Sequence, residues 1–189
     1  VISMFFNEGK FIDYGAGYGV FVRMMRDKGY DFYWQDKYCD NLYAKDFIYD
    51  EKTKYKLLTA YEVFEHLPDP VTEVNKMLQH SENVLFSTYL IPNNNPKPDE
   101  WWYYTTDHGQ HISLYSRKSL EVLAKKFNKN FYSNGKNVHL LSGKKIPGAF
   151  FKLLTYPVIA NYFAPISGKE SLLDSDYKTV LENLKSRGA

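Results

Sequence analysis

The sequence of 189 residues contains a single cysteine, Cys39. One cysteine cannot form an intramolecular disulfide framework, and it cannot supply the thiolates of a cysteine-built zinc site. A secreted fold held together by disulfides is therefore excluded, and we expect a reducing, cytoplasmic environment.

An excess of either charge is also lacking, since 24 Lys and Arg stand against 22 Asp and Glu, for a net charge of +2. The basic residues are scattered in short pairs such as Lys125-Lys126 and Lys144-Lys145. Nucleic-acid binding usually needs a continuous basic patch. The sequence therefore gives no strong signal for a nucleic-acid partner or a membrane surface.

Long hydrophobic runs are absent too. The longest apolar stretch, residues 148–166, is interrupted by Lys152, Pro157, Asn161 and Pro165. Crossing a bilayer takes roughly 20 predominantly apolar residues, so we expect no transmembrane segment. This stretch fits a lid, a packing helix or an interface, and an interface would allow a homodimer.

The order of the elements predicts an α/β fold. Strand-like runs at residues 10–13, 32–34, 56–60 and 83–87 alternate with helical patterns beginning at Val20 and at Pro70, which Asp69 can cap. Such alternation is typical of a mainly parallel sheet. Ser116 can cap a further helix, and Asn134-Gly135 predicts a two-residue turn in a closing antiparallel hairpin.

A glycine-rich turn follows the first predicted strand, with Gly15, Gly17 and Gly19 in the spacing Gly-x-Gly-x-Gly. The dinucleotide fingerprint needs its third glycine at the position of Val20, which disfavours a nicotinamide or flavin cofactor. Asp36 lies roughly 20 residues beyond Gly15, at the end of the next strand, where a carboxylate can accept bonds from ribose hydroxyls. Together they predict a nucleoside ligand without a pyrophosphate.

The chain resembles class I S-adenosylmethionine-dependent methyltransferases, and most closely the small stand-alone type similar to ubiquinone-biosynthesis O-methyltransferases. The resemblance covers about residues 10–143. Its motifs are residues 12–19, Gln35-Asp36, Lys45-Asp46-Phe47, residues 61–70 and residues 110–116.

The resemblance implies a Rossmann-like methyltransferase fold with a mainly parallel, twisted sheet of about seven strands flanked by helices and ending in an antiparallel hairpin. Residues 1–145 would form the S-adenosylmethionine-binding domain. Residues 146–189 would add a helical extension that packs on it as a lid or interface. Only nine residues precede the first strand, so the upstream helix of the family would be absent or unusual.

The resemblance also implies the residues of a site for S-adenosyl-L-methionine. Gly15 and Gly17 would leave room for its methionine part and ribose, Asp36 would hold the ribose hydroxyls, and Asp46 and Phe47 would meet the adenine. The complete expected set is Asp13, Gly15, Ala16, Gly17, Asp36, Asp46, Phe47, Tyr61 and Glu62.

A cluster of acids and histidines follows the strand at residues 56–60. Glu62, Glu65 and His66 are spaced so that one helical turn would present all three on one side, where they could bind a divalent metal with help from His108 or His111. In the metal-free alternative, His66 or His111 acts as a general base. A third, purely structural alternative is that Glu65 and His66 form hydrogen bonds with backbone groups at the strand end and frame the pocket.

Four consecutive aromatic residues, 101–104, lie in the loop after the strand at residues 83–87. Ligands of such sheets sit beyond the carboxyl ends of the strands, so we expect Trp101, Trp102, Tyr104 and the nearby His108 to bind the substrate. The alternative is that these aromatics only cover the end of the sheet.

The sequence thus predicts an S-adenosylmethionine-dependent methyltransferase that acts on a small or carrier-bound acceptor, at oxygen. Two alternatives stay open. One is a binding module for the same cofactor without catalysis. The other is a nicotinamide-dependent reductase, which Val20 disfavours.

Overall fold

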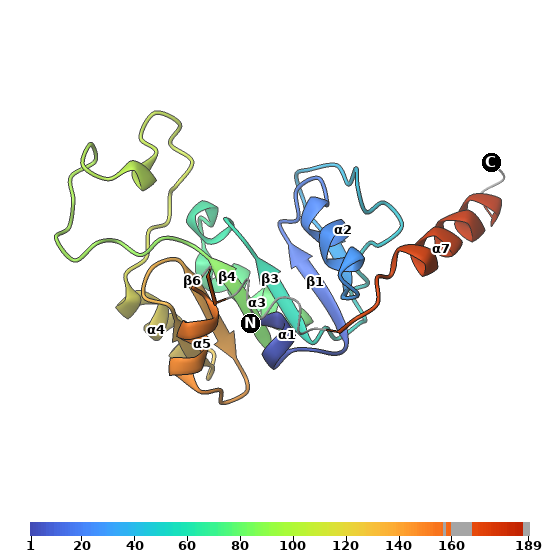
Figure 1. The fold of residues 1–189 in the computed structure, drawn as a ribbon. Helices are drawn as coiled ribbons and strands as arrows, with labels where there is room; N and C mark the ends of the chain where they lie inside the picture. Colours follow the sequence, from blue (N-terminus) through green and yellow to red (C-terminus); the bar gives the residue numbers. More distant parts are fainter. Residues whose placement is uncertain (157, 160–167, 187–189) are drawn as a thin grey trace.

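The computed structural model describes residues 1–156, 158–159 and 168–186. In this part of the chain one mixed sheet of six strands has the order β2-β1-β3-β4-β6-β5 (Figure 1). The first four strands in this order, β2, β1, β3 and β4, pair in parallel. Strand β6 lies between β4 and β5 and is antiparallel to both. The strands are β1 (Lys10–Tyr14), β2 (Asp31–Gln35), β3 (Leu57–Ala60), β4 (Asn83–Ser87), β5 (Asn130–Ser133) and β6 (Val138–Ser142). The α/β expectation is confirmed.

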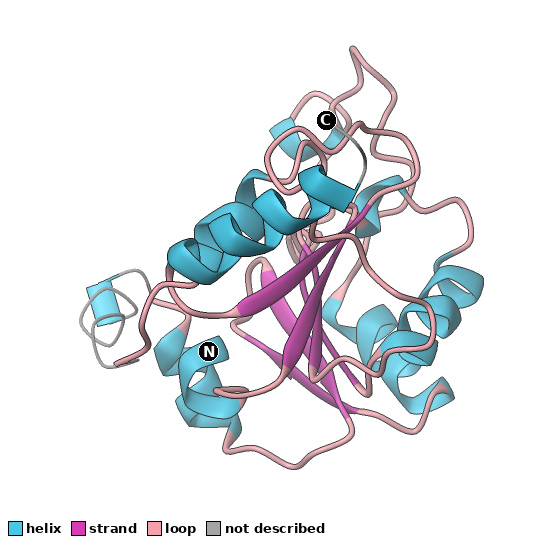
Figure 2. Cartoon of the chain, turned by 90° about the vertical axis from the view of Figure 1, so that its right-hand side faces the viewer, coloured by secondary structure: helices cyan, strands magenta, loops and turns pink. Residues whose placement is uncertain are grey.

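Helices cover both faces of the sheet (Figure 2). Because side chains alternate along a strand, Phe11 and Ile12 enter different hydrophobic clusters. Ile12 packs with residues of α3 and α4, and Phe11 packs with residues of α2 and α5. The helices are α1 (Ile2–Phe5), α2 (Val20–Asp27), α3 (Pro70–His80), α4 (Arg117–Lys126), α5 (Gly148–Leu154) and α7 (Leu173–Ser186), with short 3-10 turns η1 (Phe64–His66) and η2 (Trp102–Tyr104).

The predicted helix starts are confirmed. Asp69 accepts bonds from the backbone N–H groups of Val71 and Thr72, with Pro70 at the first helical position. Ser116 caps α4 by accepting from the backbone N–H of Ser119.

The expected count of about seven strands is wrong for the described residues, which form six. The segment after β2 makes only one isolated bridge to it, between Trp34 and Ile48. A single bridge does not make a ladder, so the outer edge beyond β2 has no seventh strand in the described chain.

The two-residue hairpin turn is also corrected, since β5 ends at Ser133 and β6 begins at Val138. The side-chain oxygen of Asn134 accepts bonds from the backbone N–H groups of Lys136, Asn137 and Val138. These bonds stabilise a turn of more than two residues, so the hydrogen-bonded ladder between β5 and β6 ends before Asn134-Gly135.

The sheet topology fixes where a ligand site can lie. The chain runs from β1 outward to β2 and then returns to pair β3 on the other side of β1. Such a reversal opens a crevice beyond the carboxyl ends of the two strands. The glycine turn after β1 and residues 61–66 after β3 both lie at this edge.

The C-terminal helix α7 is tied to α2 by a buried ion pair. The Arg26 side chain, 6% exposed, donates to both carboxylate oxygens of Asp176, which is 4% exposed. Arg26 also bonds Asp31 and the carbonyl oxygen of Phe32, and Arg23 pairs with Asp176. Residues 36–56, all described, contain no helix, so this flank is covered from the end of the chain.

The described part of the C-terminal extension predicted for residues 146–189 contains the helices α5 and α7. Residues 157 and 160–167 of the apolar stretch lie outside the described residues. Among the helices that are described, none has the length and apolar character needed to cross a membrane.

We predict that Asp176→Asn lowers the free energy of unfolding by about 3 kcal/mol, because it leaves the buried Arg26 charge with a weaker partner. Urea denaturation measures this change. The matched control is Glu121→Gln, which removes the partner of Arg117 in an exposed pair (55% and 40% exposed) and should cost less than about 1 kcal/mol. Equal losses in both variants would contradict the importance of the buried pair.

Candidate active site

The glycine turn after β1 is bonded to the end of β2. The backbone N–H groups of Gly15 and Ala16 both donate to the carbonyl oxygen of Gln35, at 2.9 and 3.1 Å. Gly17 donates its N–H to Asp36 at 2.8 Å and accepts a bond from the indole N–H of Trp34 at 2.8 Å. The turn therefore has a fixed position over the carboxyl ends of both strands.

Two glycines of this turn are needed for different reasons, although both have left-handed backbones (φ +72° at Gly15 and +52° at Gly17). A Cβ added to Gly15 would lie 2.6 Å from Cγ2 of Val63, so glycine is required there for packing. A Cβ added to Gly17 would meet nothing within 4 Å. The space above Gly17 is open, as a bound ligand would require.

The Asp36 carboxylate is held at the end of β2 by backbone donors. Besides the bond from Gly17, it accepts from the N–H groups of Tyr38 and Cys39 at 2.7 and 2.9 Å. A carboxylate has about four acceptor sites, so these three bonds leave capacity for a ribose hydroxyl. The position is the one that sequence reasoning gave for a nucleoside.

Asp13 lies buried beneath the turn and accepts a hydrogen bond from the Thr59 hydroxyl. The pKa of Asp13 is raised to about 7, chiefly by burial; the Thr59 hydrogen bond opposes this rise, and the negative charge of Asp36 adds to it. This hydrogen bond joins β1 to β3 just before the glycine turn begins.

The residues expected beside adenine have other partners in this structure. The Phe47 side chain is buried, and the Arg26 guanidinium lies 3.8 Å from its ring centre. Asp46 accepts a hydrogen bond from the side-chain amide of Asn183 in α7, at 3.0 Å. The C-terminal helix thus borders the adenine end of the expected cofactor site, which the sequence did not predict.

The segments that follow β1 and β3 carry the remaining expected cofactor residues, Ala16, Tyr61 and Glu62. The Tyr61 ring meets the ring of Phe21 edge to face at 5.2 Å, and Ala16 packs against the same hydrophobic cluster. Glu62 has a left-handed backbone (φ +52°), and its side chain accepts from the Ser87 hydroxyl.

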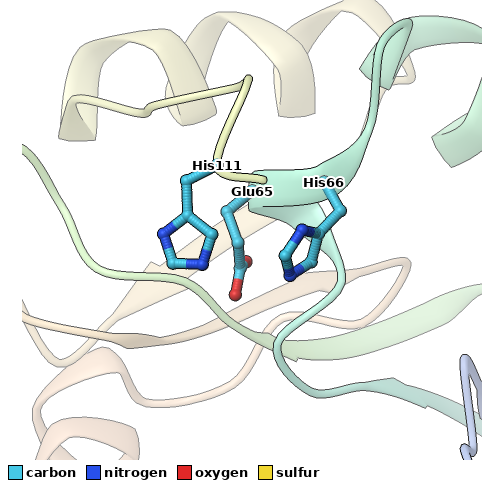
Figure 3. A group of neighbouring side chains, drawn as sticks. All are labelled: Glu65, His66 and His111. Carbon is cyan, nitrogen blue, oxygen red and sulfur yellow. The ribbon is translucent and has the colours of Figure 1, made fainter. Parts of the chain in front are cut away.

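The prediction that one helical turn presents Glu62, Glu65 and His66 together is wrong. Residues 64–66 form a 3-10 turn that begins after Glu62, whose left-handed backbone and bond to Ser87 separate it from the other two. His111, from a distant loop, takes its place. Ligand atoms of Glu65, His66 and His111 lie within 4.8 Å of one another (Figure 3).

Glu65 is unusual because it is fully buried and neither carboxylate oxygen has a hydrogen-bond partner of good geometry. Burial raises the pKa of this carboxyl, the charge of Glu62 raises it further, and the neighbouring Tyr103 hydroxyl and His66 oppose the rise. A buried carboxylate without such partners is costly, unless a cation or a proton compensates its charge.

The two histidines are oriented by backbone carbonyls. Nδ1 of His66 lies 2.9 Å from the carbonyl oxygen of Gln110, and Nδ1 of His111 lies 2.6 Å from that of Tyr103. These contacts favour a hydrogen on Nδ1, which leaves the lone pair of Nε2 for a proton or a metal. The donor set of one carboxylate and two imidazoles suits a divalent transition metal.

The aromatic loop divides between the core and a cavity. Tyr103 is buried, Trp101 is 9% exposed and Trp102 is 67% exposed. Trp101 and Trp102 line a cavity of about 550 Å³. Tyr104 donates to the carbonyl oxygen of Pro96, and neither it nor the exposed His108 is among the lining residues.

Sequence reasoning missed several residues around this site. The cavity is also lined by Tyr89, Arg117 and Lys136. Tyr89 follows β4, and Lys136 lies in the turn before the antiparallel β6, so both belong to the same edge of the sheet. The edge rule could have found these two, whereas no local signal pairs Asn183 with Asp46.

Comparisons with known proteins agree with this architecture. A family model described as a methyltransferase domain matches residues 3–133. A search of curated proteins finds no match.

Solved structures share the fold at low identity. An O-methyltransferase family 2 protein from Planctomyces limnophilus, in complex with apigenin, has a TM-score of 0.54 and 12% identity over 72% of this chain and 50% of its own. A possible histamine N-methyltransferase from Thermotoga maritima has a TM-score of 0.53 and 10% identity over 72% and 83%. Human N-acetylserotonin methyltransferase, in complex with SAM, has a TM-score of 0.54 and 11% identity over 76% and 50%. The chain spans about half the length of the first and third of these proteins.

We predict that Asp13→Asn changes how stability depends on pH. Because the folded-state pKa of Asp13 is raised from 3.8 to about 7, ionisation of this carboxyl costs wild-type stability as the pH rises through that range. The variant avoids this loss, so its stability relative to wild type should rise by up to about 4 kcal/mol between pH 4 and pH 7 and then stay level. Denaturant unfolding at a series of pH values measures the difference.

Asp50→Asn is the control with the opposite sign. Bonds from the Lys52 backbone and the Thr53 hydroxyl lower the pKa of the exposed Asp50, so its charged form stabilises the fold. That variant should lose stability relative to wild type as the pH rises through the acid range. Parallel pH profiles for wild type and Asp13→Asn would contradict the burial of an ionisable Asp13.

Proposed function

Because the chain belongs to the family of proteins with a methyltransferase domain, we propose that it transfers a methyl group from S-adenosylmethionine to an oxygen atom of a small or carrier-bound acceptor. The observation that carries this proposal is the glycine turn. It leaves open space above Gly17 and holds the Asp36 carboxylate beside that space. The human neighbour in complex with SAM supports the choice of cofactor.

Each cofactor residue has a role in this proposal. Gly15, Ala16 and Gly17 form the turn under the methionine part and the ribose, and Asp13 braces it from below. Asp36 accepts from the ribose hydroxyls. Tyr61 and Glu62 line the methionine side.

At the adenine end, Asp46 accepts a hydrogen bond from the adenine amino group. The face of the buried Phe47 ring that Arg26 does not cover packs against the adenine ring. Asn183 bonds Asp46 and so orients its carboxylate toward the base. This arrangement makes α7 part of the cofactor site, which is consistent with the proposal that residues 146–189 pack on the domain of residues 1–145 as a lid or interface.

When bound, S-adenosylmethionine supplies an activated methyl group, whose bond to sulfur breaks with its electron pair left on sulfur as an oxygen lone pair of the acceptor attacks carbon. The chain mainly has to align the two reactants. Nε2 of His66 or His111 is the proposed acceptor of the hydroxyl proton, since the Nδ1 atom of each faces a carbonyl. On the acceptor side, Trp101 and Trp102 form the wall, with Tyr104 and His108 nearby in the same loop.

As an alternative to this general-base role, we propose that Nε2 of His66 and of His111, together with Glu65, holds a divalent cation. The buried Glu65 carboxylate, which has no hydrogen-bond partner of good geometry, supports this set. A cation there would bind the acceptor hydroxyl and favour its ionised form.

The test of function uses purified protein, methyl-labelled S-adenosylmethionine, and hydroxylated small molecules or cell extract as acceptors. Transfer of label to an acceptor oxygen is the expected result. Binding of S-adenosylhomocysteine without any transfer would favour the non-catalytic module. Binding of NADH with no response to S-adenosylhomocysteine would favour the reductase and overturn the proposal.

We predict that Gly17→Ala abolishes the rise in melting temperature caused by S-adenosylhomocysteine, because the new Cβ enters the space assigned to the cofactor. Folding should be weakened only by about 1 kcal/mol, the cost of an alanine in a left-handed backbone. Gly168→Ala is a matched control, since Gly168 has φ +55° and no atom within 4 Å of an added Cβ. A variant at Gly17 that still responds to the compound would show that the turn is only structural.

We predict that Co²⁺ or Zn²⁺ raises the melting temperature of the protein, and that His66→Ala and His111→Ala each abolish the rise. Binding at a hundred times the dissociation constant is worth about 2.7 kcal/mol. His108→Ala is the control, because His108 lies in the same loop as His111 but outside the cluster. No rise in the wild type, or an unchanged rise in either histidine variant, would contradict the metal site and leave the general-base role of the histidines.

A further inference from the structure

A cavity of about 550 Å³ lies beside the carboxyl end of β4. Its volume is typical of a site for a small molecule. Its walls come from three parts of the chain, namely residues 89–93, the aromatic pair Trp101 and Trp102, and the facing ends of α4 and the hairpin turn. It lies at the edge of the sheet that carries the glycine turn.

Three aromatic side chains give the cavity flat surfaces. Tyr89 meets Trp102 edge to face at 5.1 Å, and Trp101 lies 5.3 Å from Tyr103. Tyr103 in turn lies 4.4 Å from the ring of His111, so one wall of the cavity continues into the histidine cluster. Faces of this kind suit a planar ring.

The charged side chains that line the cavity are both cationic. Arg117 is the first residue of α4, and Lys136 lies in the hairpin turn with its Nζ 5.9 Å from the ring centre of Tyr89. Nε of Arg117 donates a hydrogen bond to Glu121. Among the described residues that line the cavity, none is acidic. The N-terminus of α4 adds a partial positive charge at the same wall.

Backbone hydrogen bonds hold the two segments that carry Arg117 and Lys136 against residues 89–91. Leu90 donates its N–H to the carbonyl oxygen of Lys136 at 2.9 Å, and Ile91 donates to that of Tyr115 at 2.8 Å. The hairpin turn and the start of α4 are therefore held at a set spacing around residues 89–91. The cavity combines aromatic surfaces with two cationic side chains on segments of set spacing.

From this combination we propose that the cavity binds a planar acceptor that carries an acidic group, a carboxylate or a phosphate ester, paired with Arg117 and Lys136. The ring of the acceptor lies against Tyr89, Trp101 and Trp102. This inference rests on the proposed function in calling the bound molecule a methyl acceptor. Its binding to the cavity requires neither S-adenosylmethionine nor methyl transfer.

Isothermal titration calorimetry without S-adenosylmethionine tests the binding. The probes are two acids, caffeate and 1-naphthyl phosphate, each compared with its neutral partner, methyl caffeate and 1-naphthol. We expect at least one acid to bind about tenfold more tightly than its neutral partner. The acid that shows the larger preference identifies carboxylate or phosphate as the recognised group.

The double variant Arg117→Gln/Lys136→Gln should lose this preference while still binding the neutral compounds. Lys118→Gln/Lys125→Gln is the matched control, with the same change of charge on exposed positions of α4 that do not line the cavity. The proposal is overturned if neither acid binds at millimolar concentration, if the neutral partners bind as tightly, or if the control pair loses the preference equally. Failure of cofactor binding or methyl transfer would be seen separately, in the assays of the proposed function.

Discussion

The arrangement at the carboxyl edge of the sheet depends on the bonds between the glycine turn and the end of β2. The carbonyl oxygen of Gln35 and the carboxylate of Asp36 accept three backbone N–H groups from residues 15–17. Left-handed glycines make that geometry possible, because side chains at these positions would be strained or would meet Val63. The same contacts that close the turn therefore place the Asp36 carboxylate next to the open space at Gly17. A change that disrupts the turn would also displace this carboxylate from the proposed cofactor site.

A second constraint acts from the far end of the chain. Residues 36–56, between β2 and β3, form no helix. Apart from Asp176 on α7, the acceptors of the Arg26 guanidinium are Asp31 and the carbonyl oxygen of Phe32. Asp176 supplies two further acceptors, and the helix that carries it extends to Asn183 and its bond with Asp46. One buried ion pair thus connects the packing of the C-terminal helix to the adenine end of the proposed cofactor site.

The sequence predicted the parts of this structure that depend on local chemistry. The strand and helix order, the caps at Asp69 and Ser116, and the glycine turn followed by Asp36 all have short-range causes. The errors had different causes. The seventh strand that the resemblance implied has no counterpart among the described residues, where the segment after β2 makes one isolated bridge. The Asn134 side chain lengthened the hairpin turn by local bonds, and the long-range bond between Glu62 and Ser87 separated Glu62 from the other ligands. The sequence named His111 as a further ligand only as an alternative to His108, because no local pattern says which loop residue reaches Glu65 and His66. The sequence also did not predict that Phe47 packs beneath Arg26, because the packing of separate elements brings these two side chains together.

The distribution of charge gives the two halves of the proposed site different chemical preferences. Asp36 and Asp46 lie on the side assigned to a donor with a positive sulfonium, and Arg117 and Lys136 line the cavity assigned to the acceptor. A cationic donor and an anionic acceptor would each bind poorly in the other's half, since like charges oppose them there. In the proposed arrangement, Arg117 and Lys136 would pair with the acidic group of the acceptor and not with its reacting oxygen, so they would orient the acceptor without holding back the lone pair that attacks the methyl carbon. Orientation of this kind is what methyl transfer needs most, and in the same proposal the histidine cluster, which the Tyr103 ring joins to Trp101, would accept the hydroxyl proton.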